Sequence, residues 1–123
     1  MQTRQVLHQP PSLFHRDIRW PNVVRQADDL SLWFLIDWDD AAGPNTVAAS
    51  HLSTNNHSPN VFVDGHGGEV DIWGVGMLII ESAKFVFNIS SDLITLGRWM
   101  QEVEPTSKTA LDAIMTYQSK AKI

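Results

Sequence analysis

The feature that most constrains the fold of this chain is an apolar run over 70–86, which leaves almost no polar face if it forms a helix. A helix that is apolar all round is buried in the middle of a domain. The most apolar part, 72–80, is interrupted by glycines and falls short of the about 20 residues that a membrane span needs. The run therefore predicts a buried central helix, and no membrane partner is expected.

Two further helices are predicted after the central one. Ser91 or Asp92 can cap a helix that runs to Glu102, since short polar side chains accept hydrogen bonds from the first free backbone N–H groups. The inner stripe of this helix comprises Leu93, Leu96, Met100 and Val103. Pro105 ends it, and 107–118 forms the last helix. The residues expected on the inner side of the last helix are Leu111, Ile114 and Met115.

The segments before the central helix have less regular patterns. The run 31–36 is short, apolar and aromatic, which is the pattern of a buried strand with Trp33 in the core. From 41 to 68 the chain is rich in glycine, proline, asparagine and serine, which predicts one long loop with a helical turn near 47–51. The expected fold class is mainly α, with one or two short strands.

Length and composition restrict the classes of function. A chain of 123 residues makes one domain, expected over 12–118 and followed by a tail over 119–123. Residues 1–11 are expected to be disordered or the remnant of a preceding helix. The formal charge of −5 argues against nucleic-acid binding, and the lack of cysteine excludes disulfides and thiolate sites. The polar, proline-containing start is no signal peptide, so a cytoplasmic location is expected, although secretion as an effector is not excluded.

Three side chains with oxygen ligands stand in an order that suits phosphoryl transfer. Asp17 and Asn22 lie five residues apart in a loop, and Asp37 follows the 31–36 run. Transfer from a nucleotide needs a carboxylate that orients and deprotonates the acceptor hydroxyl, and oxygen ligands that hold Mg²⁺ against the phosphates. The sequence therefore predicts this chemistry at these three residues.

Four motifs in the chain resemble the C-terminal lobe of eukaryotic-type protein kinases. The sequence H-R-D-I-R-W-P-N at 15–22 fits the catalytic-loop pattern H-R-D-x-x-x-x-N. D-W-D at 37–39 stands in the place of D-F-G, and S-P-N at 58–60 in the place of A-P-E. V-D-I-W-G-V-G at 70–76 resembles the start of the central helix of that lobe. The resemblance implies a kinase-like C-lobe with its strands next to the catalytic loop.

The resemblance also implies roles for individual residues. Asp17 would be the catalytic base, and Asn22 and Asp37 would bind Mg²⁺ and thereby ATP. Arg19 would lie near the transferred phosphate, where serine/threonine kinases usually carry a lysine. Structural roles are implied for His15, for Arg16 as a contact of a phosphorylated activation loop, and for Asp71 as an anchor of the catalytic-loop backbone.

The same comparison shows departures from the kinase pattern. Asp39 replaces the glycine of D-F-G, which makes the backbone stiffer. No lysine and no glycine-rich loop precede His15, so the N-terminal lobe is missing. The expected function is ATP-dependent phosphorylation of protein Ser/Thr hydroxyls by a domain that is not active alone and needs an N-lobe. The alternative is a catalytically dead, pseudokinase-like module that binds a protein partner.

Weaker alternatives remain beside these two. Small-molecule kinases of the aminoglycoside type usually carry H-G-D in the place of H-R-D, which ranks them lower. The 15–22 motif is also similar to that of divergent fungal kinase-like proteins and Crinkler-type effectors. A metal site at His51, His57 and His66 has no ligand spacing to support it. The glycine-rich stretch 65–68 fits a turn before the helix better than a phosphate cradle.

Overall fold

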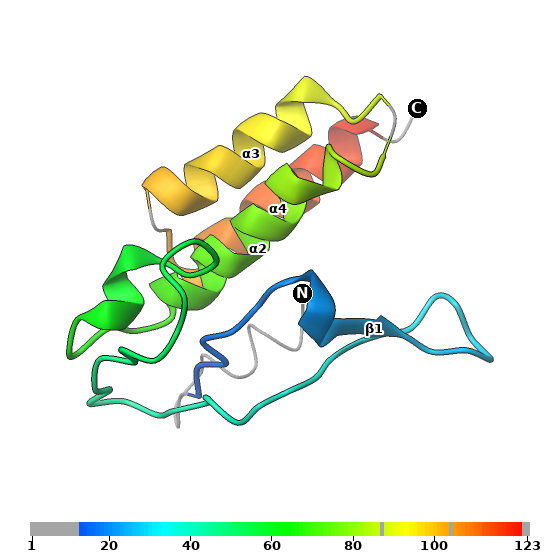
Figure 1. Ribbon diagram of the computed structural model, residues 1–123. Coiled ribbons are helices and arrows are strands. Elements are labelled where there is room, and N and C mark those ends of the chain that lie inside the picture. The colour runs from blue at the N-terminus through cyan, green and yellow to red at the C-terminus, as the bar shows by residue number, and fades with distance from the viewer. Residues whose placement is uncertain (1–12, 87, 104, 122–123) are drawn as a thin grey trace.

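The computed structural model describes residues 13–86, 88–103 and 105–121, and the expectation for 1–11 lies outside these ranges. The described part is mainly helical, with one antiparallel pair of short strands, which confirms the expected fold class. The α-helices are α2 (Glu69–Ser82), α3 (Ser91–Glu102) and α4 (Ser107–Ala121). The strands are β1 (Val23–Arg25) and β2 (Trp33–Leu35), and the short 3-10 helices are η1 (Trp20–Asn22) and η2 (Pro59–Phe62). Figure 1 shows the α-helices together on one side and the hairpin on the other.

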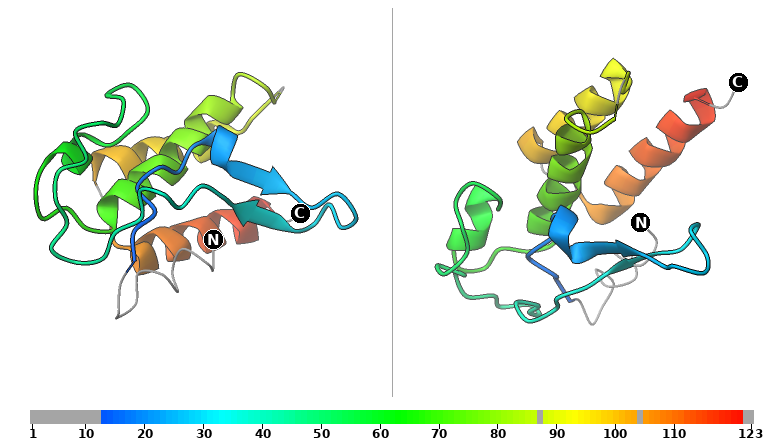
Figure 2. Two further views of the ribbon diagram at one scale, coloured as in Figure 1. Left: turned by 60° about the horizontal axis from the view of Figure 1, so that its bottom comes forward. Right: turned by 45° about the vertical axis from the view of Figure 1, so that its right-hand side comes forward.

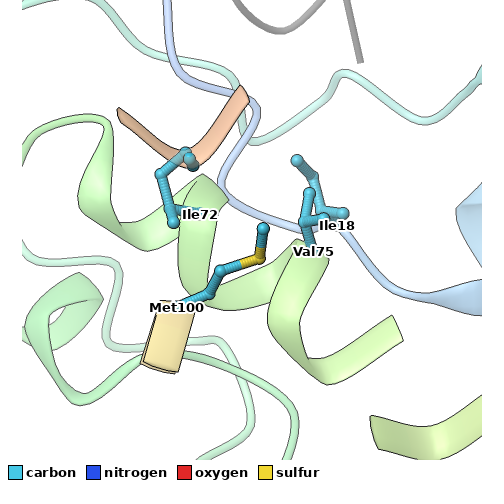
Figure 3. Close-up of a cluster of buried hydrophobic side chains, with 5 residues drawn as sticks. Ile18, Ile72, Val75 and Met100 are labelled. Carbon is cyan, nitrogen blue, oxygen red and sulfur yellow. The ribbon is translucent and has the colours of Figure 1, made fainter. Parts of the chain in front are cut away.

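The core forms where α2 meets α3, α4 and the segment before η1. Its buried residues are Ile18, Ile72, Val75, Met100 and Ala110, and Figure 3 shows the first four pointing toward one another. Ile18 belongs to the 15–22 motif, so apolar burial fixes this loop directly onto the central helix. The prediction that the central helix is buried is confirmed for its first half, where almost every residue from Val70 to Gly76 is buried.

Helices α2 and α3 approach closely because glycine faces glycine. A Cβ atom on Gly76 would lie 2.5 Å from the carbonyl oxygen of Gly97, and one on Gly97 would lie 3.0 Å from the carbonyl oxygen of Gly76. Both obstacles are backbone atoms, which cannot move without shifting a helix. These two positions therefore set the distance between the helices.

We expect Gly76→Ala to lower the free energy of unfolding by about 2 kcal/mol, because the added methyl forces α2 and α3 apart. Urea unfolding followed by circular dichroism measures the change. Gly67→Ala is the matched control, since its Cβ would meet only the movable carboxylate end of Glu69, at 3.1 Å. Equal stability of the Gly76→Ala and Gly67→Ala proteins would contradict the close packing.

The hairpin differs from the sequence expectation in its burial. β1 pairs with β2 in the register Val23–Leu35, Val24–Phe34 and Arg25–Trp33. Trp33 is 53% exposed and Phe34 is 50% exposed, so the prediction of a buried strand with Trp33 in the core is wrong. The sheet has two strands, and the other described elements leave these rings uncovered; Arg25 lies over the Trp33 ring, 4.8 Å from its centroid. The loop joining the strands projects from the body in all views (Figure 2).

A short polar network shapes that projecting loop. The carboxylate of Asp29 accepts hydrogen bonds from the hydroxyl and the backbone N–H of Ser31, at 2.6 and 3.1 Å. These bonds favour the charged form and lower the pKa of Asp29.

The helix ends also correct several expectations. α2 stops at Ser82, and the chain turns there, so Phe85 is 79% exposed and does not belong to a buried helix. α3 begins one residue earlier than predicted, with Ser90 as the cap that accepts a hydrogen bond from the backbone N–H of Asp92. Val103 and Met115, which were expected on inner helix faces, are exposed. Val103 follows the last turn of α3, and Met115 lies on the outer side of α4. In α4, Ala110 is fully buried. None of the helices in the described ranges is long and apolar enough to cross a membrane.

The 41–68 segment is irregular, as predicted, but it is packed. Ala49, Val61 and Val70 form a second small core, which ties the segment to the start of α2. The expected helical turn is a single turn closed by the hydrogen bond from Leu52 N–H to the Ala49 carbonyl, 3.1 Å. The segment also brings two buried histidines, His57 and His66, to residues of the 15–22 loop.

Candidate functional site

The 15–22 loop is held in place by one buried carboxylate on the central helix. Asp71 accepts hydrogen bonds from the backbone N–H of His15 at Oδ2, 2.9 Å, and from the backbone N–H of Arg16 at Oδ1, 2.8 Å. Its side chain comes from the first turn of α2 and is almost fully buried. Hydrogen bonds to a charged acceptor are the stronger kind, so Asp71 fixes the loop backbone just before Asp17.

His15 links this loop to the segment after β2. Its Nδ1 accepts from the backbone N–H of Asp17, 3.1 Å, so its Nε2 carries the proton and donates to the carbonyl of Ile36, 2.9 Å. The ring also meets Trp38 edge to face, with centroids 4.5 Å apart. Asp37 stands between these two contacts, so buried His15 holds Asp37 beside the loop.

Asp17 and Asn22 are in direct contact. Asn22 Nδ2 donates to the backbone carbonyl of Asp17, 2.8 Å, and to its carboxylate Oδ2, 3.0 Å. Since Nδ2 is committed to Asp17, Oδ1 is the Asn22 atom left for a cation. Ile36 N–H donates to the Asn22 carbonyl, 2.8 Å, which brings the Asp37 backbone next to Asn22.

Asp37, which the sequence assigns to a cation site, has an uncommon backbone conformation. It is exposed and has a φ of 60°, a left-handed conformation that is uncommon for a residue with a side chain. Arg16 has a φ of 71°, so strained backbone occurs on both sides of the site. Such strain persists where the surrounding structure enforces it, and it clusters at functional sites.

The donor set of Asn22 and Asp37 fits Mg²⁺. Both offer hard oxygen atoms, and Mg²⁺ is usually bound by one or two carboxylates together with phosphate oxygens and water. No cluster of three or more His, Cys, Asp or Glu suited to a metal is found in the described ranges. A site shared with nucleotide phosphates needs only one or two protein carboxylates, so it does not depend on such a cluster.

Arg19 and Arg16 are both engaged within the protein. Arg19 Nε donates to Asp17 Oδ1, 3.0 Å, with about a third of its side chain exposed, so the guanidinium lies at the carboxylate. Arg16 donates to the carbonyls of Asp40 and Val47, 2.6 and 3.2 Å, and lies 3.3 Å from His66 Nε2. The residue expected to contact a phosphorylated loop is thus bound to unmodified backbone of that loop.

The sequence reasoning missed one residue that contacts Asp17, which is His57. Its Nε2 lies 2.7 Å from Asp17 Oδ1, and both side chains are buried. In the sequence, His57 stands out only as a member of a poorly supported metal site with His51 and His66. No motif spacing could have found the contact, because the partners are 40 residues apart and the chain between them is irregular.

The comparisons with known proteins agree with one part of the sequence interpretation. The chain is 33% identical over 117 residues to Crinkler effector protein 8 of Phytophthora infestans. The match covers 87% of this chain but 19% of that protein, so the chain spans about a fifth of the length of the relative. No family model matches the chain. The resemblance to a Crinkler-type effector is therefore supported, and the kinase assignment stays a proposal.

Proposed function

We propose that this chain is the catalytic lobe of a protein kinase-like domain, which transfers the γ-phosphoryl group of ATP to a Ser or Thr hydroxyl of a protein. The observation that carries the proposal is the direct contact of Asp17 with Asn22, beside the segment that carries Asp37. They are joined by the bonds of Asn22 to Asp17 and of Ile36 to Asn22. Asp71 and His15 hold these parts of the chain in place through their hydrogen bonds.

Each residue of the site has its own role in the proposed phosphoryl transfer. Asp17 accepts the proton of the acceptor hydroxyl and orients it toward the phosphorus. Asn22 Oδ1 and the Asp37 carboxylate would hold Mg²⁺, which neutralises phosphate charge. Arg19, whose side chain is 39% exposed, supplies positive charge beside Asp17, on the side proposed for the phosphate.

The proposed activity needs a second lobe that grips the nucleotide. Kinases use a glycine-rich loop and a strand lysine for this purpose. The hairpin offers an apolar surface on which such a lobe can rest, since its exposed residues include Leu32, Trp33, Phe34 and Ile36. The much greater length of the relative supports the idea that further chain completes the site. We place the reaction inside a cell, where ATP is available, whether the protein acts in its own cytoplasm or as an effector.

Magnesium-dependent nucleotide binding tests the proposal, first on the 123-residue chain and then on a longer protein that contains it together with a second lobe. The indole N–H of Trp38 donates to the Leu35 carbonyl, 2.9 Å, next to Asp37. We expect its NMR signal to shift when Mg²⁺ and ATP are added together, and not with ATP alone. Trp99, which packs against the helical core, is the internal control.

The matched variant for this experiment is Asp37→Asn, which keeps the shape but loses the charged ligand. We expect it to abolish the magnesium-dependent shift of Trp38. If millimolar Mg²⁺ and ATP leave Trp38 unmoved in a longer protein that contains this domain and a second lobe, the kinase proposal fails.

A non-catalytic interaction module is the second candidate, and two observations favour it. The Asp17 carboxylate already accepts hydrogen bonds from Arg19, Asn22 and His57. The hairpin presents large apolar side chains to solvent, as protein-binding surfaces do. For this candidate, Trp33→Ser on the hairpin would abolish partner binding, while Asp37→Asn would have no effect on any function.

A further inference from the structure

We propose that His57 is a positioning residue for Asp17: it fixes one carboxylate oxygen, so that the other is presented to the acceptor hydroxyl. The inference rests on the proposed role of Asp17 as base. It concerns a contact that the kinase-like motifs do not contain, and it is carried by the buried pair His57–Asp17, with 2.7 Å between Nε2 and Oδ1.

The direction of this hydrogen bond follows from its partners. An ionised carboxylate can only accept, so His57 Nε2 carries the proton and donates it. The other ring nitrogen, Nδ1, lies 2.8 Å from the carbonyl oxygen of Ser53 and 3.4 Å from its hydroxyl. The imidazole therefore has polar neighbours at both ring nitrogens, in a site where its side chain is 6% exposed.

The two oxygens of Asp17 are used unequally. Oδ1 accepts from His57 at 2.7 Å and from Arg19 at 3.0 Å, whereas Oδ2 accepts from Asn22 alone, at 3.0 Å. A carboxylate oxygen has two lone-pair positions. Oδ1 is therefore filled, and Oδ2 retains one position. The geometry assigns Oδ2 as the atom that receives the hydroxyl proton.

His57 also links the orientation of the Asp17 carboxylate to the position of the 41–68 segment. It directly precedes Ser58, the N-cap of η2, whose side chain accepts from the backbone N–H of Asn60. Val61 of η2 belongs to the second small core. A shift of this segment would move the imidazole and rotate the Asp17 carboxylate. The segment is thereby coupled to the orientation of the base.

The contact itself is tested by NMR of the histidine side chains, whether or not the chain transfers phosphate. We expect a His57 Nε2–H signal that exchanges slowly with water and disappears in the His57→Gln protein. It is expected to exchange at least tenfold faster in Asp17→Ala. His51 is the control, because its Nε2 contacts Asp40 at the surface, where the ring is largely exposed. A His57 proton that exchanges as fast as that of His51, or that is indifferent to Asp17→Ala, overturns the inference.

The effect on catalysis separates positioning from mere folding. In a form of the protein that transfers phosphate, His57→Ala is expected to lower kcat roughly 10- to 100-fold, with KM for ATP unchanged, since Asn22 and Asp37 are untouched. His57→Gln should recover most of the rate, because its amide donates from about the same place, and His51→Gln should have no effect. If His57→Ala raises KM for ATP as much as it lowers kcat, or increases the rate, His57 does not position the base. If the unmodified domain has already been shown to bind no nucleotide, the NMR result still decides whether the contact exists.

Discussion

Asp17→Asn is expected to slow phosphoryl transfer about 100- to 10,000-fold, the range that a positioned acid or base contributes. The substitution keeps the size of the side chain and an oxygen that accepts hydrogen bonds. It removes the basicity needed for the hydroxyl proton. Transfer of labelled γ-phosphate, measured in the 123-residue chain or in a longer protein that contains it, gives the rate.

A comparison of two aspartates makes this prediction specific. Asp17→Asn should leave the magnesium-dependent shift of the Trp38 indole unchanged, because Asp17 is the proposed base and not a proposed ligand of Mg²⁺. Asp37→Asn should remove both the shift and the transfer. An Asp17→Asn protein that transfers phosphate at the original rate would show that Asp17 is not the base.

The helical part of the fold was predictable because its determinants are local. A polar cap, a stripe of apolar residues and a proline placed α3 within one residue of its start, and the apolar run placed α2 at the centre. Burial was less predictable, because it depends on what covers a residue. The aromatic run with Trp33 forms a strand, but the described part of the chain provides no layer over it.

The site shows the same division between local and distant determinants. The spacing of Asp17 and Asn22 predicted that they lie together, and their side chains are hydrogen-bonded, 3.0 Å apart. His57 lies in a segment without periodicity, and its approach to Asp17 depends on the packing of that segment, whose Val61 belongs to the second small core. A motif defines the residues next to the chemistry, whereas tertiary packing decides which others reach them.

The left-handed conformation of Arg16 has a cost that the surrounding bonds must offset. A non-glycine residue at φ 71° carries strain of about 1 kcal/mol or more. Its backbone N–H is bound by Asp71, and its guanidinium by the carbonyls of Asp40 and Val47. The partners in these bonds lie on α2 and between residues 40 and 47. Both parts of the chain must therefore be in place for the 15–22 loop to keep its conformation.

Asp71→Ala is therefore expected to lower the free energy of unfolding by about 4 kcal/mol, since it leaves the buried N–H of His15 and the partly buried N–H of Arg16 without their carboxylate. Asp71→Asn should cost about half as much, because the amide oxygen can still accept one of the two bonds. Urea unfolding measures both variants, and the Asn form keeps the series measurable if the Ala form does not fold.

The matched control for this series is Asp112, which is exposed on α4. Asp112→Ala and Asp112→Asn should each change the free energy of unfolding by less than about 0.5 kcal/mol. The graded loss at Asp71 tests the anchoring bonds individually, because a packing defect would make the smaller Ala residue costly and the isosteric Asn residue harmless. An Asp71→Asn protein as stable as the unmodified chain would mean that the carboxylate does not hold the loop.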